Sequence, residues 1–126
     1  MRGFRVSEVE NNCHVYILAS ESQSLVKVGK SNNARRVPHL IEMCYGGAED
    51  WRQVGIFSLA SNHAAVAVES MIHARLANQG FRRSRFPWLN RLNNRPSFAD
   101  ECFTCSAEHA ISTSEHMVSV YQASVA

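Results

Sequence analysis

Residues 14–31 of the chain are HVYILASESQSLVKVGKS, and two apolar runs within them set the expected topology. Residues 14–19 are β-branched, aromatic and apolar, which predicts a buried strand. Residues 25–29 alternate apolar and polar side chains and predict a second strand. The polar residues 21–24 between them predict a loop, so the fold is expected to begin with a β-hairpin.

Helices and further strands are predicted in alternation after this hairpin. Capping residues at 31–33 predict a helix running towards Tyr45, with a start that Pro38 delays because it lacks a backbone donor. The later elements are a strand at 52–60, a helix at 62–79 ended by Gly80, a short strand at 101–105 and a C-terminal helix at 107–123. This order predicts an α+β fold with a small antiparallel sheet of about three strands, flanked by helices.

The composition is that of an ordinary globular domain. The 126 residues are 45% hydrophobic and 19% charged, which argues against disorder and favours one domain over residues 1–126. No apolar run approaches the roughly 20 residues that a bilayer requires, and the charged start lacks a secretory signal's apolar core. The four scattered cysteines do not make a disulfide scaffold, so we expect a cytoplasmic protein with reduced thiols.

Positive charge is concentrated in residues 81–95. This segment holds five arginines, Arg82, Arg83 and Arg85 among them, and no acid. It therefore carries +5, whereas the whole chain carries only +2 and the remaining residues sum to −3. Because guanidinium groups meet phosphates and the segment's aromatic rings can stack on bases, it is a candidate nucleic-acid surface. A solvated arginine loop is the alternative.

Glu69 has an unusual place on its predicted helix. At about 100° per residue, Glu69 falls only about 20° from Leu76, within the edge of the apolar face. The other members of that face are Ala65, Val68, Met71 and Ile72. A carboxylate there needs a cation, either an arginine or a metal ion. His73 follows one turn later and could support whatever Glu69 binds, and a plain Glu–Arg bridge is the alternative.

The first two strands resemble the paired signature of the GIY-YIG nuclease superfamily. HVYIL at residues 14–18 and LVKVGKS at residues 25–31 are most similar to its phage-type branch, whose second motif begins with lysine. Tyr16 then matches the tyrosine of the first motif, Lys27 the leading lysine and Gly29 the glycine of the second.

The resemblance extends over about residues 13–110. The family has an arginine on the next helix, where Arg35 and Arg36 lie, with Arg36 nearer the usual spacing. It also has a metal-binding glutamate on a later helix, often as E-x-x-x-H, which Glu69 and His73 match. In the phage-type branch a glutamate–aromatic pair follows, and Glu101–Phe103 is a loose counterpart.

The resemblance implies a metal-dependent endonuclease that cuts nucleic acid, with DNA as the expected substrate. Tyr16, with Lys27 beside it, would accept or relay the proton of the attacking water. Arg36 would clamp the scissile phosphate. Glu69 would hold one Mg²⁺ or Mn²⁺ ion. A homodimer is compatible with this activity, because one active site cuts one strand.

Six further residues are expected to have supporting roles. His73 and Lys30 would serve in orientation or phosphate contact, while Arg35, Arg82, Arg83 and Arg85 would bind the nucleic-acid backbone.

Two other interpretations stay open. His14 stands in place of the first motif's glycine and Pro38 interrupts the next helix, which favours a nucleic-acid-binding module without cleavage. Cys102 and Cys105 form C-x-x-C with two histidines, His109 and His116, downstream, which is half of a usual zinc site, although no second C-x-x-C exists.

Overall fold

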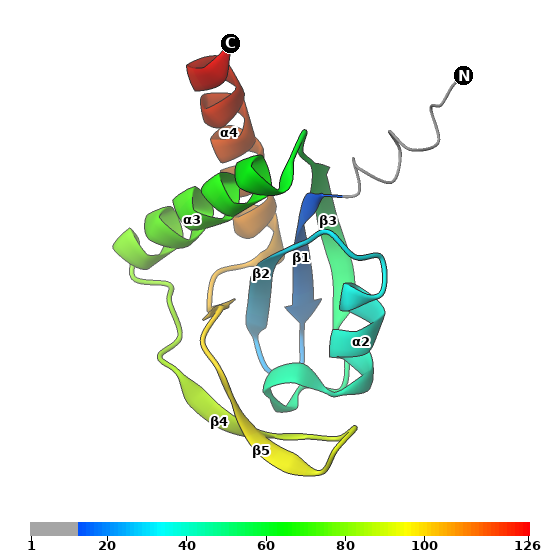
Figure 1. The fold of residues 1–126 in the computed structure, drawn as a ribbon. Coiled ribbons are helices and arrows are strands. Elements are labelled where there is room, and N and C mark those ends of the chain that lie inside the picture. Colours follow the sequence, from blue (N-terminus) through cyan, green and yellow to red (C-terminus); the bar gives the residue numbers. More distant parts are fainter. Residues whose placement is uncertain (1–12) are drawn as a thin grey trace, which may run out of the picture.

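Strands β1 (His14–Ser20) and β2 (Leu25–Ser31) form the antiparallel hairpin expected from the sequence. The computed structural model, which describes residues 13–126, adds β3 (Arg52–Ser58) beside β1 and the two-residue β6 (Cys102–Phe103) beside β2 (Figure 1). The sheet has the order β3–β1–β2–β6. The short strand predicted at residues 101–105 is β6, which pairs with β2 and forms one edge of the sheet. The α+β class is confirmed.

One face of the sheet packs against α3 (Asn62–Asn78) and α4 (Ala107–Val125) (Figure 1). Their core cluster includes alternate residues of β1 and the apolar stripe of α3, namely Val15, Ile17, Ala19, Ala65, Val68, Ile72 and Leu76. Ser61 caps α3 by accepting a hydrogen bond from the Ala64 backbone N–H. As predicted, Gly80 follows the end of this helix, with a φ of 83°. None of the described helices is long and apolar enough to cross a membrane.

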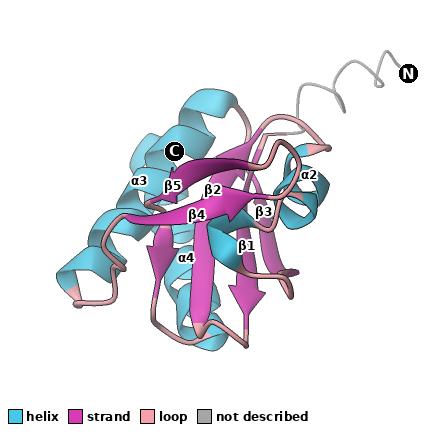
Figure 2. Ribbon diagram, turned by 90° about the horizontal axis from the view of Figure 1, so that it is seen from below, coloured by secondary structure: helices cyan, strands magenta, loops and turns pink. Residues whose placement is uncertain are grey.

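The opposite face is covered by α2 (Arg36–Glu42), the 3₁₀ helix η1 (Tyr45–Gly47) and a second hairpin. That hairpin consists of β4 (Phe86–Asn90) and β5 (Arg95–Ala99), which Figure 2 shows running crosswise to the strands of the sheet. Pro38 is the third residue of α2, where a backbone N–H has no helical partner, so its missing donor is tolerated. The helix begins at Arg36, later than capping residues at 31–33 would place it, and its N-cap is Arg35. That Pro38 causes this delay stays a prediction.

The sequence pattern predicts no strand in the basic segment 81–95, only a loop between elements, yet residues 86–90 are β4 and β5 begins at Arg95. Pro87 and Pro96 hide the strand pattern, since proline is confined to open edges of a sheet. In a two-stranded ribbon each strand has one edge without a neighbour, and a proline nitrogen can face that edge.

Ile72→Ala tests the packing of α3 against the sheet. Ile72 is fully buried, so its truncation should leave a cavity and lower the free energy of unfolding by about 2–5 kcal/mol. Thermal unfolding followed by circular dichroism should show a fall in Tm of about 10 °C. Val66→Ala on the exposed side of α3 is the matched control and should change stability by less than about 0.5 kcal/mol. Equal shifts in the two variants would contradict this packing.

Candidate active site

Lys27 is the buried centre of the site. Its Nζ donates hydrogen bonds to the Tyr16 hydroxyl oxygen at 3.0 Å and to Glu101 Oε1 at 2.7 Å. Nζ also lies 5.1 Å from the centroid of the Tyr16 ring and 4.9 Å from that of Tyr45. Burial by itself would lower the pKa of Lys27, but electrostatic interactions with Tyr16 and Glu101 outweigh it and raise that pKa. The ammonium therefore stays protonated.

Gly29 allows the phenol and the ammonium to meet. It pairs with Tyr16 across the β1–β2 hairpin, and the end of the tyrosine ring lies over it. A Cβ added at Gly29 would overlap the Tyr16 hydroxyl and lie only 2.9 Å from Lys27 Nζ. Any larger residue at position 29 would displace one of these groups. This steric limit explains why the second motif has a glycine at this position.

Glu101 completes the buried group, although the sequence suggested it only as a loose family counterpart. Its backbone carbonyl accepts a hydrogen bond from the Val28 N–H at 3.3 Å, which holds it against β2. Burial would raise the pKa of Glu101, but the Lys27 ammonium outweighs this effect and lowers it. The E-x-F pattern ending at Phe103 was the one signal in the sequence that pointed to this residue.

A cavity of about 330 Å³ opens beside this group. Strand β6 pairs only with Val26 and Lys27 of β2. The C-terminal part of β2 therefore has no neighbouring strand on that side, and the cavity lies there. It is lined from β1, β2, the following loop, α2, α3 and the chain just before β6, by Tyr16, Lys30, Ser31, Asn32, Asn33, Arg36, Glu69 and Glu101. Residues predicted from distant parts of the sequence thus share one cleft.

Glu69 is the half-buried carboxylate of this cleft. Burial raises its pKa, and the charge of Glu101 adds to the rise, while His73, Lys27 and Lys30 oppose it. Within residues 13–126 the Glu69 side chain makes no hydrogen bond or ion pair, so the Glu–Arg bridge considered from the sequence is absent there.

The donors present suit a hydrated divalent ion. Mg²⁺ prefers oxygen ligands and keeps several waters, so one or two carboxylates suffice to hold it. Among the described residues no group of three or more His, Cys, Asp or Glu side chains could hold a metal. A metal here would therefore rest mainly on Glu69.

Arg36 lines the cleft and Arg35 does not. Arg36 is the first residue of α2, and its charge helps to lower the pKa of Glu101. Arg35 precedes the helix as its N-cap and is exposed. Lys30 Nζ donates to Asn62 Oδ1 at 3.3 Å, which ties β2 to the start of α3.

His73 holds α3 against β2. Its Nε2 lies 2.8 Å from the Val28 carbonyl oxygen, and because a carbonyl only accepts, Nε2 carries the proton. This hydrogen bond attaches α3 to β2 at a point one helical turn after Glu69. His73 is not among the residues that line the cleft.

Arg82, Arg83 and Arg85 run beside the chain that leads to Glu101. The Arg83 backbone N–H donates to the Cys102 carbonyl oxygen of β6 at 2.9 Å. The Arg82 guanidinium donates to the Asp100 carbonyl oxygen at 3.2 Å. All three arginine side chains are exposed.

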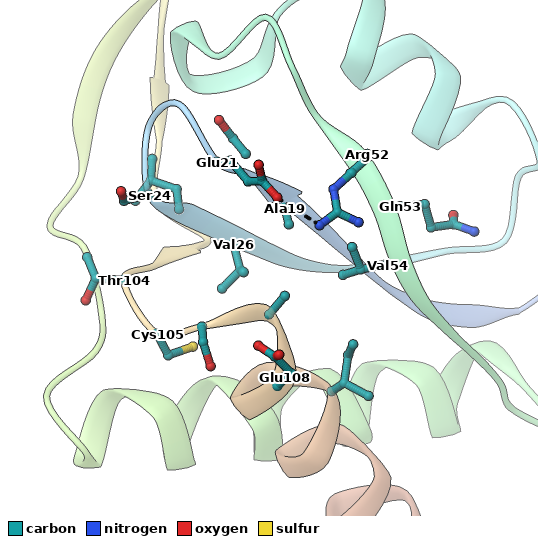
Figure 3. A pocket seen from close by; sticks show the side chains of 15 residues that line it. Ala19, Glu21, Ser24, Val26, Arg52, Gln53, Val54, Thr104, Cys105 and Glu108 are labelled. Atoms are coloured by element: carbon teal, nitrogen blue, oxygen red, sulfur yellow. Dashed lines mark hydrogen bonds and ion pairs between the residues drawn. The ribbon is translucent and has the colours of Figure 1, made fainter.

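The larger cavity, about 950 Å³, lies at another part of the described chain and contains none of the predicted site residues. Figure 3 shows it between the β1–β2 turn, β3 and the start of α4. Its charged side chains are exposed, and two of them, Arg52 and Glu21, already pair at 3.2 Å. The smaller cleft is therefore the better candidate for chemistry.

The zinc interpretation is wrong for the described residues. Cys102 belongs to the core cluster on the α2 face of the sheet, and Cys105 to the cluster on the α3 and α4 face. Burial raises the pKa of the Cys102 thiol to about 11 and also raises that of Cys105, so both stay protonated. His109 Nε2 instead lies 2.7 Å from the side-chain oxygen of Gln79.

The fold is consistent with a small α+β domain of the nuclease-like kind. The profile of the T5orf172 domain, which is found in phage and nuclease-like proteins, matches residues 13–118. The chain belongs to the T5orf172 domain family. No curated protein and no solved structure matches it.

Glu69→Gln is expected to stabilise the protein at neutral pH without metal. Because the folded pKa of Glu69 is raised above its ordinary value of 4.5, ionisation is disfavoured in the folded chain. The penalty is present above about pH 4.5 and disappears below it, so the gain in Tm should be seen at pH 7 and vanish near pH 4. Thermal melts in EDTA across this range measure it.

Glu115→Gln on the exposed side of α4 controls for the general loss of one negative charge. A lower Tm for Glu69→Gln at pH 7 would mean that the carboxylate pairs with a protein cation.

Proposed function

We propose that the protein is a metal-dependent endonuclease of the GIY-YIG kind, related to its phage-type branch, that hydrolyses phosphodiester bonds of DNA. One observation carries the proposal. A single cleft holds a tyrosine bonded to a buried ammonium, an arginine, and a carboxylate that has no cation partner among residues 13–126. Hydrolysis needs an activated water, positive charge at the phosphate and help for the leaving oxygen, and these groups match those needs.

Tyr16 is the group suited to handle the proton of the attacking water. Tyr16 acts as the phenolate, whose own proton has gone to solvent. The water oxygen bonds to phosphorus, the bond to the leaving oxygen breaks, and one water proton passes to the phenolate oxygen. Lys27 donates to that oxygen and so stabilises its negative charge. Since Lys27 stays protonated, it cannot itself be the base. The leaving oxygen takes a proton from solvent.

Arg36 and Glu69 serve the phosphate. Arg36 can offer two parallel N–H donors to its oxygens, and Lys30 adds a second positive charge to the wall of the cleft. Glu69 would hold one Mg²⁺ or Mn²⁺, which supplies Lewis acidity at the phosphate when bound. Glu101 and His73 are positioning residues, because Glu101 fixes Lys27 and His73 fixes the helix of Glu69.

A nicking assay tests the proposal. Purified protein should nick supercoiled plasmid DNA with Mg²⁺ or Mn²⁺ and not in EDTA. Glu69→Gln and Tyr16→Phe should each lower the rate at least about a hundredfold, with DNA binding retained. Mg²⁺ should also raise the Tm of the wild type and not that of Glu69→Gln.

Glu115→Gln should nick at the wild-type rate. A wild-type protein that binds DNA and cuts none with either metal would be a binding module instead.

The triple change of Arg82, Arg83 and Arg85 to Ala tests the basic surface. Binding to duplex DNA should weaken, and the slope of log K against log salt should fall by about one unit per lost phosphate contact. Fluorescence anisotropy over a KCl series measures both. Arg52→Ala, on the β3 edge far from β6, is the control. An unchanged slope in the triple variant would leave these arginines a solvated surface.

A further inference from the structure

The β4–β5 hairpin has one apolar face that remains exposed. Trp88 lies on the inner face and is buried. The cross-strand pairs Pro87–Phe98 and Leu89–Pro96 alternate with it and lie on the outer face. Leu89 is 46% exposed and Phe98 is 54% exposed, and both prolines are exposed. Together the side chains of Pro87, Leu89, Pro96 and Phe98 form the hairpin face.

An arginine stacks on the hairpin face. The Arg85 guanidinium lies 4.3 Å from the centroid of the Phe98 ring. Phe98 is still more than half exposed, so much of its ring remains available for a second flat group. Residues 81–99 hold five arginines and no acid, and one of the five, Arg91, pairs with Glu49 at 2.8 Å. The occupant of this face must therefore suit both an apolar surface and the positive charge of Arg85.

A nucleic-acid strand with unpaired bases meets both conditions. Bases stack on aromatic side chains and on arginine planes, and the phosphates between them meet the guanidinium groups. A second copy of the chain would instead bring two positively charged segments together, and the repulsion opposes that pairing. Of the five arginines in each segment, only Arg91 forms an ion pair in the described part of the chain, with Glu49. Paired bases in a duplex expose no stacking surface along its length, so an unpaired stretch is favoured.

The hairpin face lies close to the cleft along the chain. Phe98 precedes Glu101 by three residues, which span at most about 10 Å when extended, or about three stacked nucleotides. Figure 1 shows β5 leading directly into β6 at the edge of the sheet. A strand whose phosphate enters the cleft could therefore reach the hairpin face with its neighbouring bases.

We propose that the hairpin face stacks unpaired bases, so that the preferred substrate has a single-stranded stretch beside the bond that is cut. The proposal rests on the proposed function for the position of the cut. The stacking itself requires binding and not cleavage.

Binding measurements in EDTA test the stacking apart from any cleavage. The probes are a labelled 12-nucleotide oligothymidine and a blunt duplex of the same length, each titrated in fluorescence anisotropy. Phe98→Ala and Leu89→Ala should each weaken single-strand binding about tenfold and change duplex binding little. Their salt slope should stay that of the wild type, because no phosphate contact is lost.

Two further variants sharpen the test. Phe98→Trp should retain single-strand affinity and add an indole emission that the oligothymidine quenches. Ile56→Ala, which removes an exposed apolar side chain from β3, should leave binding unchanged. Circular dichroism melts check that each variant is folded.

Several results would overturn the stacking. Wild-type single-strand affinity in both Phe98→Ala and Leu89→Ala would do so, as would a wild-type dimer in ultracentrifugation that Leu89→Ala dissociates. A wild type that binds no single strand would also overturn it, even where plasmid is nicked. If the variants lose single-strand binding while the wild type nicks nothing, the stacking stands and the endonuclease proposal fails.

Discussion

A protonated amine inside a protein core is tolerated only where other groups satisfy its charge and its N–H donors. Lys27 meets this condition with one carboxylate, one phenol oxygen and two aromatic rings. Glu101 comes from the chain before β6, Tyr16 from β1 and Tyr45 from η1. The ammonium therefore connects parts of the chain that are distant in sequence. Folding itself fixes the tyrosine hydroxyl, which needs no substrate to be positioned.

The short length of β6 creates the cleft beside this ammonium. A longer strand would cover the edge of β2 and leave no room next to Tyr16. An uncovered edge exposes unpaired backbone groups, and here the side chain of His73 satisfies the Val28 carbonyl. The same bond holds α3 beside the opening, so that Glu69 reaches it. Two carboxylates then share the cleft with opposite pKa shifts. Burial raises the pKa of Glu69, whereas the bonded Lys27 ammonium lowers that of Glu101.

Local patterns made much of this fold predictable. The first hairpin and α3 follow from apolar periodicity and capping residues, and Tyr16, Lys27 and Glu69 follow from motifs on those elements. Glu101 could not be assigned in this way, since its bond to Lys27 closes a separation of 74 residues. The choice between Arg35 and Arg36 depends on where a seven-residue helix begins, which sequence spacing resolves poorly. The second hairpin was missed because its prolines imitate a loop.

The second hairpin exposes features that favour self-association, and its positive charge opposes that association. A two-stranded ribbon has open edges, and an exposed apolar face such as that of Leu89 and Phe98 invites self-association. Residues 81–99 hold five arginines and no acid, and although Arg91 pairs with Glu49, the remaining positive charge opposes the approach of a second copy. The same charge attracts a polyanion, whose phosphates remove the repulsion and whose bases can cover the apolar rings. A surface that is unfavourable for a second copy of the chain is thus favourable for nucleic acid, and this difference underlies the selectivity that we propose for the hairpin.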